Sequence, residues 1–235
     1  MIGKLGKLPA KVDGRTLRLE RYLVTEALPK VPAAVDWQDG LHSWDGDPLG
    51  NDNFGDCAYA APGHAITLAS KLAGIPSPVT AAGILDAYGA TGWDPARPET
   101  DQGAYLLDVL KQWRNDGICR VRIEAFVSVA VEHIDAAVAL FGGVILGFRL
   151  PATIEGQDIW DATNPQAPTL GGHAVYQFAT SPGLGVVNTW GIRQAFTPAF
   201  RARYCDEAYS VLMPSLPVPS GLDLAKLRSD LALIS

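Results

Sequence analysis

The stretch "NDNFGDCAYAAPGHAI", Asn51 to Ile66, decides the fold of this 235-residue chain. Apolar residues after Cys57 recur at the spacing of one helix face: Ala58, Ala61, Ala65, Leu68 and Leu72. The pattern predicts a helix that begins at Cys57 and stops near Gly74, with Pro62 as an awkward residue near its start. Cys57 is therefore a nucleophile, a metal ligand with His64, or a small buried apolar residue, which is the usual fate of a lone cysteine.

A cysteine nucleophile attacks as the thiolate, so its pKa must be lowered, and a helix N-terminus contributes to this. The expected position of Cys57 at a helix start meets that requirement. Asp56 opposes it by its charge, although the same carboxylate is a candidate helix cap. A general base must also reach the sulfur, and a third group must orient the base.

Of the histidines, His64 lies two helical turns from Cys57, about 10 Å along the axis at 1.5 Å per residue. We therefore expect His64 to be a packed or surface helix residue. His173 follows two glycines, Gly171 and Gly172, and opens the apolar strand "AVYQF". A histidine at a strand start is usually structural, but together with Cys57 this pattern favours a catalytic base.

The orienting group is expected from a neighbouring strand. "VVNTWG" supplies Asn188 at its end, and two adjacent antiparallel strands can place Asn188 beside His173. An amide can hold one imidazole tautomer, and Trp190 can shield that bond from water. An ordinary strand-end turn is the alternative interpretation of Asn188.

The segments "VPAAVDWQDG", "NDNFGDCAYAA", "GGHAVYQF" and "VVNTWG" resemble the papain-like cysteine peptidases, in a divergent form of bacterial or phage type. The resemblance covers residues 31–214, in the family's order and with roughly its separations. It implies that Cys57 is the nucleophile, His173 the base and then the acid, and Asn188 the orienting residue. The implied α+β fold has a helical half packed on an antiparallel β-barrel-like half, with the active-site cleft between them and no metal or cofactor.

Helical patterns precede strand patterns along the chain, which independently predicts an α+β fold.

The departures from the family concern the site. The family's oxyanion-stabilising glutamine is replaced by Asn51, one methylene shorter, and losing such a donor costs on the order of 100-fold in rate. Gly103, Gly172 and Trp190 are expected to bind substrate. The segment before the match is shorter than the usual inhibitory pro-segment, so activation by its removal is not implied.

The sequence divides into three parts. Residues 1–30 form a basic extended arm, in which "TLRLERYL" (residues 16–23) is expected to be a short strand. Residues 31–214 form the peptidase domain, with a helical half at about 51–120 and a β half at about 121–214. Residues 215–235 form a proline-rich linker and a helix whose apolar stripe docks on its own body or on a partner. Ser220 would cap that helix, with Asp223 in its first turn.

The formal net charge of −6 gives no global basic field for nucleic acid. The sequence has neither an apolar run of membrane-span length nor a signal peptide. We therefore expect synthesis in the cytoplasm, with incorporation in a virion as the further option. Three cysteines cannot make a disulfide framework, and the odd count leaves a free thiol.

Three functions are compatible with these residues. The leading one is hydrolysis of peptide or protein substrates through the Cys-His-Asn triad. The alternative is a weakly active or inactive papain-like domain in a larger assembly such as a phage particle, held by the arm and the terminal helix. A peptidoglycan amidase of Cys-His type is the third. A zinc site from Cys57, His64, His173 and Cys205 is disfavoured, because no pair has close ligand spacing.

Overall fold

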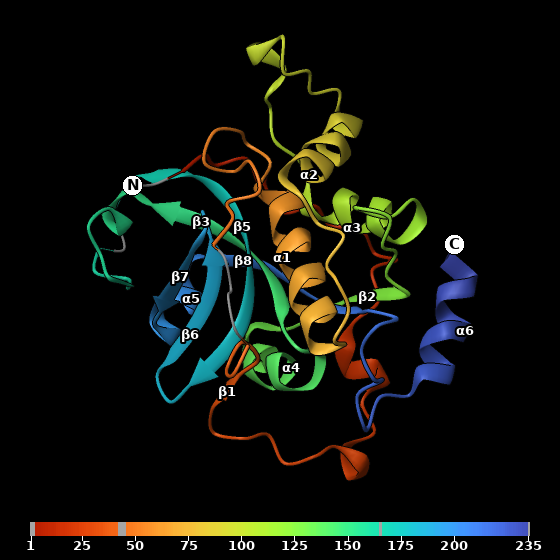
Figure 1. Cartoon of the computed structure of the whole chain (residues 1–235). Coiled ribbons are helices and arrows are strands. Elements are labelled where there is room, and N and C mark those ends of the chain that lie inside the picture. The colour runs from red at the N-terminus through yellow and green to blue at the C-terminus, as the bar shows by residue number, and fades with distance from the viewer. Residues whose placement is uncertain (1–2, 42–45, 165, 235) are drawn as a thin grey trace.

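An open, mostly antiparallel sheet of eight strands forms one half of the chain (Figure 1). The computed structural model describes residues 3–41, 46–164 and 166–234. Its strands are β1 (Val35–Asp36), β2 (Ala125–Ser128), β3 (Val144–Pro151), β4 (Ile159–Trp160), β5 (Thr169–Ser181), β6 (Leu184–Thr189), β7 (Ile192–Phe196) and β8 (Cys205–Leu212). They are ordered β2-β8-β3-β5-β6-β7-β4, and β1 pairs with β5. The β4–β7 pair is parallel.

The sheet does not close into a barrel, which corrects the barrel-like expectation. Its two outermost strands in the described chain, β2 and β4, have four and two residues. Such short edges offer few backbone groups for a closing pair. Mixed α+β architecture, with helices preceding most of the strands, agrees with the sequence prediction.

Helices cover both faces of the sheet (Figure 1). They are α1 (Cys57–Leu72), α2 (Ala81–Tyr88), α3 (Leu106–Asn115), α4 (Ile134–Phe141), α5 (Pro198–Tyr204) and α6 (Leu224–Ile234). Short 3₁₀ turns are η1 (Leu19–Tyr22), η2 (Thr25–Ala27), η3 (Gly89–Thr91), η4 (Pro98–Thr100), η5 (Val131–His133) and η6 (Ala152–Ile154). Helices α1 to α3 share a core with one face, and α4 to α6 share a core with the other. No described helix is long and apolar enough to cross a membrane.

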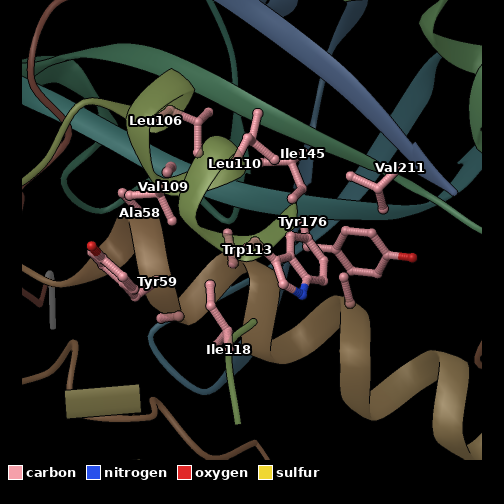
Figure 2. Close-up of a cluster of buried hydrophobic side chains, with 14 of the residues drawn as sticks. Ala58, Tyr59, Leu106, Val109, Leu110, Trp113, Ile118, Ile145, Tyr176 and Val211 are labelled. Atoms are coloured by element: carbon pink, nitrogen blue, oxygen red, sulfur yellow. The ribbon is translucent and has the colours of Figure 1, made fainter. Parts of the chain in front are cut away.

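Helix α1 has the predicted bounds and runs through Pro62 without interruption. It is buried along most of its length because it lies between α2, α3 and strand β5. Figure 2 shows Trp113 and Leu110 of α3 packed among α1 and Ile145 and Tyr176 of the sheet. This packing holds the start of α1, and therefore Cys57, against strand β5.

Two local predictions were wrong in detail. Residues 16–23 form the 3₁₀ turn η1 and two isolated bridges, Arg18 with Ser128 and Leu23 with Leu222, and not a strand. Leu19 and Tyr22 are three residues apart and both buried, which suits the three-residue repeat of a 3₁₀ turn. The last helix begins at Leu224, where the Asp223 carboxylate, and not Ser220, accepts from a first-turn backbone N–H.

Helix α6 packs on the chain's own body. Leu227 and Leu231 are buried in the core, and the Tyr22 hydroxyl donates to Asp230 at 2.8 Å. The Lys226 ammonium donates to the Arg21 carbonyl at 2.8 Å. The apolar stripe predicted from the sequence therefore has an intramolecular partner in η1.

Candidate active site

Cys57 is the first residue of α1 and is completely buried. Its Sγ accepts a hydrogen bond from the Ala174 backbone N–H at 3.4 Å. Ala174 follows His173 in β5, so the two sequence-predicted residues come together across the contact between α1 and β5. Asp56 occupies the N-cap position without making a side-chain cap bond, which corrects the expectation that it caps the helix.

His173 is held on two sides. Its ring stacks on the Trp190 indole, with ring centroids 4.3 Å apart, and its Nε2 lies 2.6 Å from Thr189 Oγ1. Its Nδ1 is buried and has no hydrogen-bond partner among the described residues. One ring nitrogen is therefore anchored, and the other has no partner among the described residues.

Trp190 reaches this position from the two-residue turn between β6 and β7. Thr189 pairs with Ile192 across the turn, and both Trp190 and Gly191 have positive φ, at 45° and 76°. Such a turn matches the right-handed twist of the two strands. It costs a bulky residue some backbone strain. The strained turn lays the indole over the His173 ring.

Asn188 is buried beside this group, but in the described structure neither polar atom of its amide has a hydrogen-bond partner. It pairs in register with Tyr176 of β5. The hydroxyl that bonds His173 belongs to the next residue, Thr189. Sequence reasoning did not single out Thr189, although it stands inside the quoted motif "VVNTWG". The orienting role of Asn188 remains a prediction.

Asn51 lies in the loop before α1 and uses both of its amide hydrogens. The Asn51 Nδ2 group donates to the Phe54 carbonyl at 2.9 Å and to the Lys4 carbonyl at 3.1 Å. The second bond is to the N-terminal arm, so removal of the arm would free one donor. The oxyanion role predicted for Asn51 therefore requires that the arm leave.

A polar network outside the sequence predictions holds the walls of the cleft. Asp101 accepts from the Gly55 backbone N–H at 3.0 Å and from the Tyr88 hydroxyl at 2.6 Å. That hydroxyl in turn accepts from the Gly103 backbone N–H at 2.9 Å. The loop before Cys57 is thereby tied to Gly103, which faces it.

The N-terminal arm runs between Gly172 of β5 and Ala104, and the space that it occupies there is called the cleft. The Gly6 and Lys7 backbone N–H groups both donate to the Gly172 carbonyl, at 3.2 and 3.0 Å. On the other side, Leu8 N donates to Ala104 O at 2.9 Å and Ala104 N donates to Gly6 O at 2.8 Å. The segment is thus bound from both sides by backbone bonds, as an added strand would be.

Two glycines make this close passage feasible. A methyl group on Gly6 would lie 1.7 Å from the Gly55 carbonyl oxygen, and one on Gly103 would lie 1.9 Å from the Gly6 carbonyl oxygen. The predicted substrate-binding residues Gly103 and Gly172 both touch the arm, and the Trp190 indole donates to the Lys4 carbonyl at 3.2 Å. All three residues therefore contact a peptide segment in the cleft.

With the arm in place, burial favours the neutral forms of Cys57 and His173. It raises the pKa of the Cys57 thiol to about 11, and the adjacent Asp56 carboxylate adds to the rise. It lowers the pKa of the His173 imidazole to about 3. Burial also raises the pKa of Asp56 to about 8, against the opposing effect of the Asn51 side chain. Both Cys57 and His173 are therefore neutral at physiological pH while the arm covers them.

His64 is buried within α1, and burial lowers its pKa to about 4. Within the residues that the structure describes, no group of three or more His, Cys, Asp or Glu side chains is arranged to hold a metal ion.

The sequence matches no protein-family model, and no curated protein matches it. Solved structures do. Xylellain, a cysteine protease from Xylella fastidiosa, superposes with a TM-score of 0.72 at 15% identity, over 90% of this chain and 96% of xylellain. The fold is papain-like. Procathepsin B from Trypanosoma congolense gives a TM-score of 0.62 at 12% identity, over 90% of this chain and 87% of that one.

A third structure, the Carica candamarcensis cysteine protease CMS1MS2 in complex with E-64, gives a TM-score of 0.54 at 14% identity. It matches 78% of this chain and 99% of its own. At identities this low, the three similarities establish the papain-like fold and nothing finer.

Proposed function

We propose that this chain is a cysteine peptidase whose cleft is closed by its own N-terminal arm. The observation that carries the proposal is the extended backbone of Gly6 and Lys7, bound from both sides beside Cys57 and His173. A cleft that binds a peptide backbone next to a thiol and an imidazole has the parts that peptide hydrolysis requires.

In the proposed reaction, His173 takes the proton of Cys57, and the thiolate attacks the carbonyl carbon of the substrate peptide bond. The oxygen of the resulting tetrahedral intermediate is stabilised by the Cys57 backbone N–H and by the amide of Asn51. The intermediate collapses as His173 gives its proton to the leaving amine, and an acyl-enzyme thioester forms. Water activated by His173 then hydrolyses the thioester and restores Cys57.

The arm prevents this cycle for three reasons. It occupies the space that a substrate needs, and it uses one donor of Asn51 through the Lys4 carbonyl. It also keeps water from Cys57 and His173, and their pKa values are consequently displaced toward the neutral forms. Release of the arm restores hydration and so favours the thiolate–imidazolium pair.

Displacing the arm is therefore expected to activate the thiol. The change Gly6→Val places a side chain where even one carbon atom would overlap Gly55. We expect a peptidyl epoxide to label Cys57 at least about tenfold faster in this variant, since each 1.4 kcal/mol of lost arm binding is a factor of ten. Peptide mapping by mass spectrometry would measure the rate at each cysteine.

Gly14→Val is the matched control, because nothing lies within 4 Å of the corresponding position on Gly14. It should label at the rate of the unaltered chain. Cys57→Ser in the Gly6→Val background should abolish the fast labelling. Equal labelling of Cys57, Cys119 and Cys205 in Gly6→Val would contradict the proposal.

The residue that orients His173 is a second testable feature. Thr189→Val keeps the shape of the side chain and removes the hydroxyl that lies 2.6 Å from His173 Nε2. In the Gly6→Val background we expect it to slow labelling of Cys57 by about tenfold, as expected for loss of a hydrogen bond worth roughly 1–1.5 kcal/mol. It should also shift the pH profile of labelling, because the bond selects an imidazole tautomer.

Thr189→Ser, which keeps the hydroxyl, should restore both the rate and the pH profile. Asn188→Ala is the comparison that decides between neighbours. If Asn188→Ala slows labelling and moves the pH profile whereas Thr189→Val does neither, the orienting role belongs to Asn188.

The alternative of an inactive assembly component gains no support from the terminal segments. The described parts of both segments pack on the chain's own body, the arm in the cleft and α6 against η1. Attachment to a phage particle or another assembly therefore stays a prediction from the sequence alone.

A further inference from the structure

A lysine is buried in the cleft beside the nucleophile. The side chain of Lys7 has no solvent exposure, and its Nζ lies 2.8 Å from Glu207 Oε1 and 3.0 Å from Asp206 Oδ1. The same ammonium donates to the Leu8 carbonyl at 3.1 Å. Glu207 and Asp206 are themselves only 5% and 15% exposed, so the charges meet away from water.

The fold builds this pocket with a strand irregularity. Consecutive strand residues normally point to opposite faces. The register of β3 with β8 shifts between Gly147 and Phe148, which pair with Glu207 and Cys205 and leave Asp206 as the extra residue. A bulge of this kind redirects a side chain. It lets the neighbouring carboxylates of Asp206 and Glu207 both reach the same ammonium.

The walls of the pocket fit an unbranched side chain. A methyl group on Gly147 would lie 2.4 Å from Lys7 Cε and 2.8 Å from Lys7 Cδ, so the glycine leaves room for the lysine stem. The Tyr209 hydroxyl donates to Glu207 Oε2 at 3.1 Å and holds that carboxylate in place. Arg149 approaches Asp206 only at 3.9 Å and is largely exposed. The two carboxylates therefore carry one more unit of negative charge than the Lys7 ammonium neutralises.

The backbone contacts of the arm at this point are independent of its sequence. Gly172 and Ala104 bind the main chain of Gly6 to Leu8, as they would bind any extended peptide. The acidic pocket is where a side chain is selected. Burial raises the pKa of Glu207, and the Lys7 ammonium opposes that rise, so an occupant without positive charge leaves carboxylates buried and uncompensated.

We infer that the pocket formed by Asp206, Glu207, Gly147 and Tyr209 is the specificity subsite of the cleft and selects peptides that place a lysine beside the reacting bond. The role of the pocket in the reaction rests on the proposed function, whereas its binding preference is a property of the pocket itself. In the covered state Lys7 of the arm occupies the subsite that a substrate lysine takes after the arm leaves.

Binding can be tested apart from catalysis. The full chain carrying Gly6→Val and Cys57→Ser would be titrated with a fluorescent peptide copying residues 3–10, and with the same peptide carrying norleucine in place of its second lysine. We expect the lysine peptide to bind at least about tenfold more tightly, because the norleucine peptide leaves two carboxylates unpaired. Adding Asp206→Asn and Glu207→Gln should remove the difference. Equal affinity, or no measurable binding of either peptide, would overturn the inference.

Hydrolysis is measured in a separate experiment. The Gly6→Val chain would be given peptide amides with lysine or norleucine scanned across the positions on both sides of the cleaved bond. We expect one position at which lysine raises kcat/KM at least about tenfold, a difference of 1.4 kcal/mol in transition-state binding. Cleavage without any lysine preference would overturn the subsite and leave the peptidase proposal intact. A binding preference without labelling or cleavage would leave the subsite and overturn the peptidase.

Discussion

Replacing Lys7 with methionine is expected to detach the arm and speed the labelling of Cys57 by about a hundredfold or more. The substitution keeps much of the unbranched stem but leaves Asp206 and Glu207 without their ammonium in a nearly dry pocket. Removing one partner of a buried ion pair costs about 3–5 kcal/mol. Detachment lets water reach both carboxylates and so avoids that cost. The labelling rate then rises until the cleft is fully open.

Lys11→Met is the matched control for this experiment. Lys11 belongs to the same arm and its Nζ lies 2.6 Å from Asp108 Oδ2, but the two side chains are 45% and 47% exposed. Exposed pairs contribute about 1 kcal/mol or less. Labelling should therefore change little, and the backbone amides of Gly6 and Lys7 should stay protected from hydrogen exchange. Similar behaviour of the two methionine variants would show that Lys7 does not hold the arm.

The approach of Cys57 to the strand that carries His173 could be predicted from the sequence, because the helix and the strand each have a local pattern. Helical periodicity after Cys57 predicts the start of α1, and the apolar strand after His173 predicts β5. The long helix must pack on the sheet to bury its apolar residues, and this brings Cys57 to Ala174, the neighbour of His173. Strand β5 itself begins earlier than predicted, at Thr169.

The closure of the cleft was not accessible, because it depends on contacts between backbone atoms. Gly6 is an unremarkable glycine in the sequence, and Gly103 was expected only to bind substrate. Their close approach in the folded chain shows why neither has room for a side chain. The Lys7 pocket depends on a register shift between β3 and β8, and neither strand's pattern of apolar residues encodes it. Neighbouring acidic residues at 206 and 207 would ordinarily be assigned to opposite faces of the strand.

The bond between His173 and Thr189 was missed for a related reason. Sequence reasoning chose Asn188 by residue type, since an amide is a good partner for an imidazole. Side chains of adjacent strand residues point to opposite faces, so the register of β6 on β5 decides which of the two neighbours can face the ring. That register is a property of the folded sheet, in which Thr189 makes the bond.

Asp56 should make the stability of the chain depend on pH. Its folded pKa is about 8, whereas an unperturbed aspartate titrates near 3.8. The folded state therefore holds a proton that the unfolded state loses. Stability from this group is fully present below about pH 4 and is lost as pH rises toward 8, by up to roughly 1.4 kcal/mol per unit. Asp56→Asn removes the titration and keeps an N–H donor where the protonated acid has an O–H.

The quantity to measure is the difference in the free energy of urea unfolding between the unaltered chain and Asp56→Asn, from pH 4 to 9. His64 and His173 have folded pKa values lowered to about 4 and 3, so they add stability as pH rises toward their ordinary pKa of 6.5 and add no more above it. They are present in both chains, and their contribution cancels in the difference. We expect the free energy of unfolding of Asp56→Asn to rise by several kcal/mol relative to that of the unaltered chain between pH 4 and 8, and the difference then to stay constant.

Asp52→Asn removes an exposed carboxylate from the same loop and serves as the control. If both substitutions give the same flat difference across this range, Asp56 is not protonated in the folded chain. The result bears on the chemistry as well as on stability. A neutral Asp56 leaves Cys57 without a negative charge beside it, so the helix start can favour the thiolate once the arm has left.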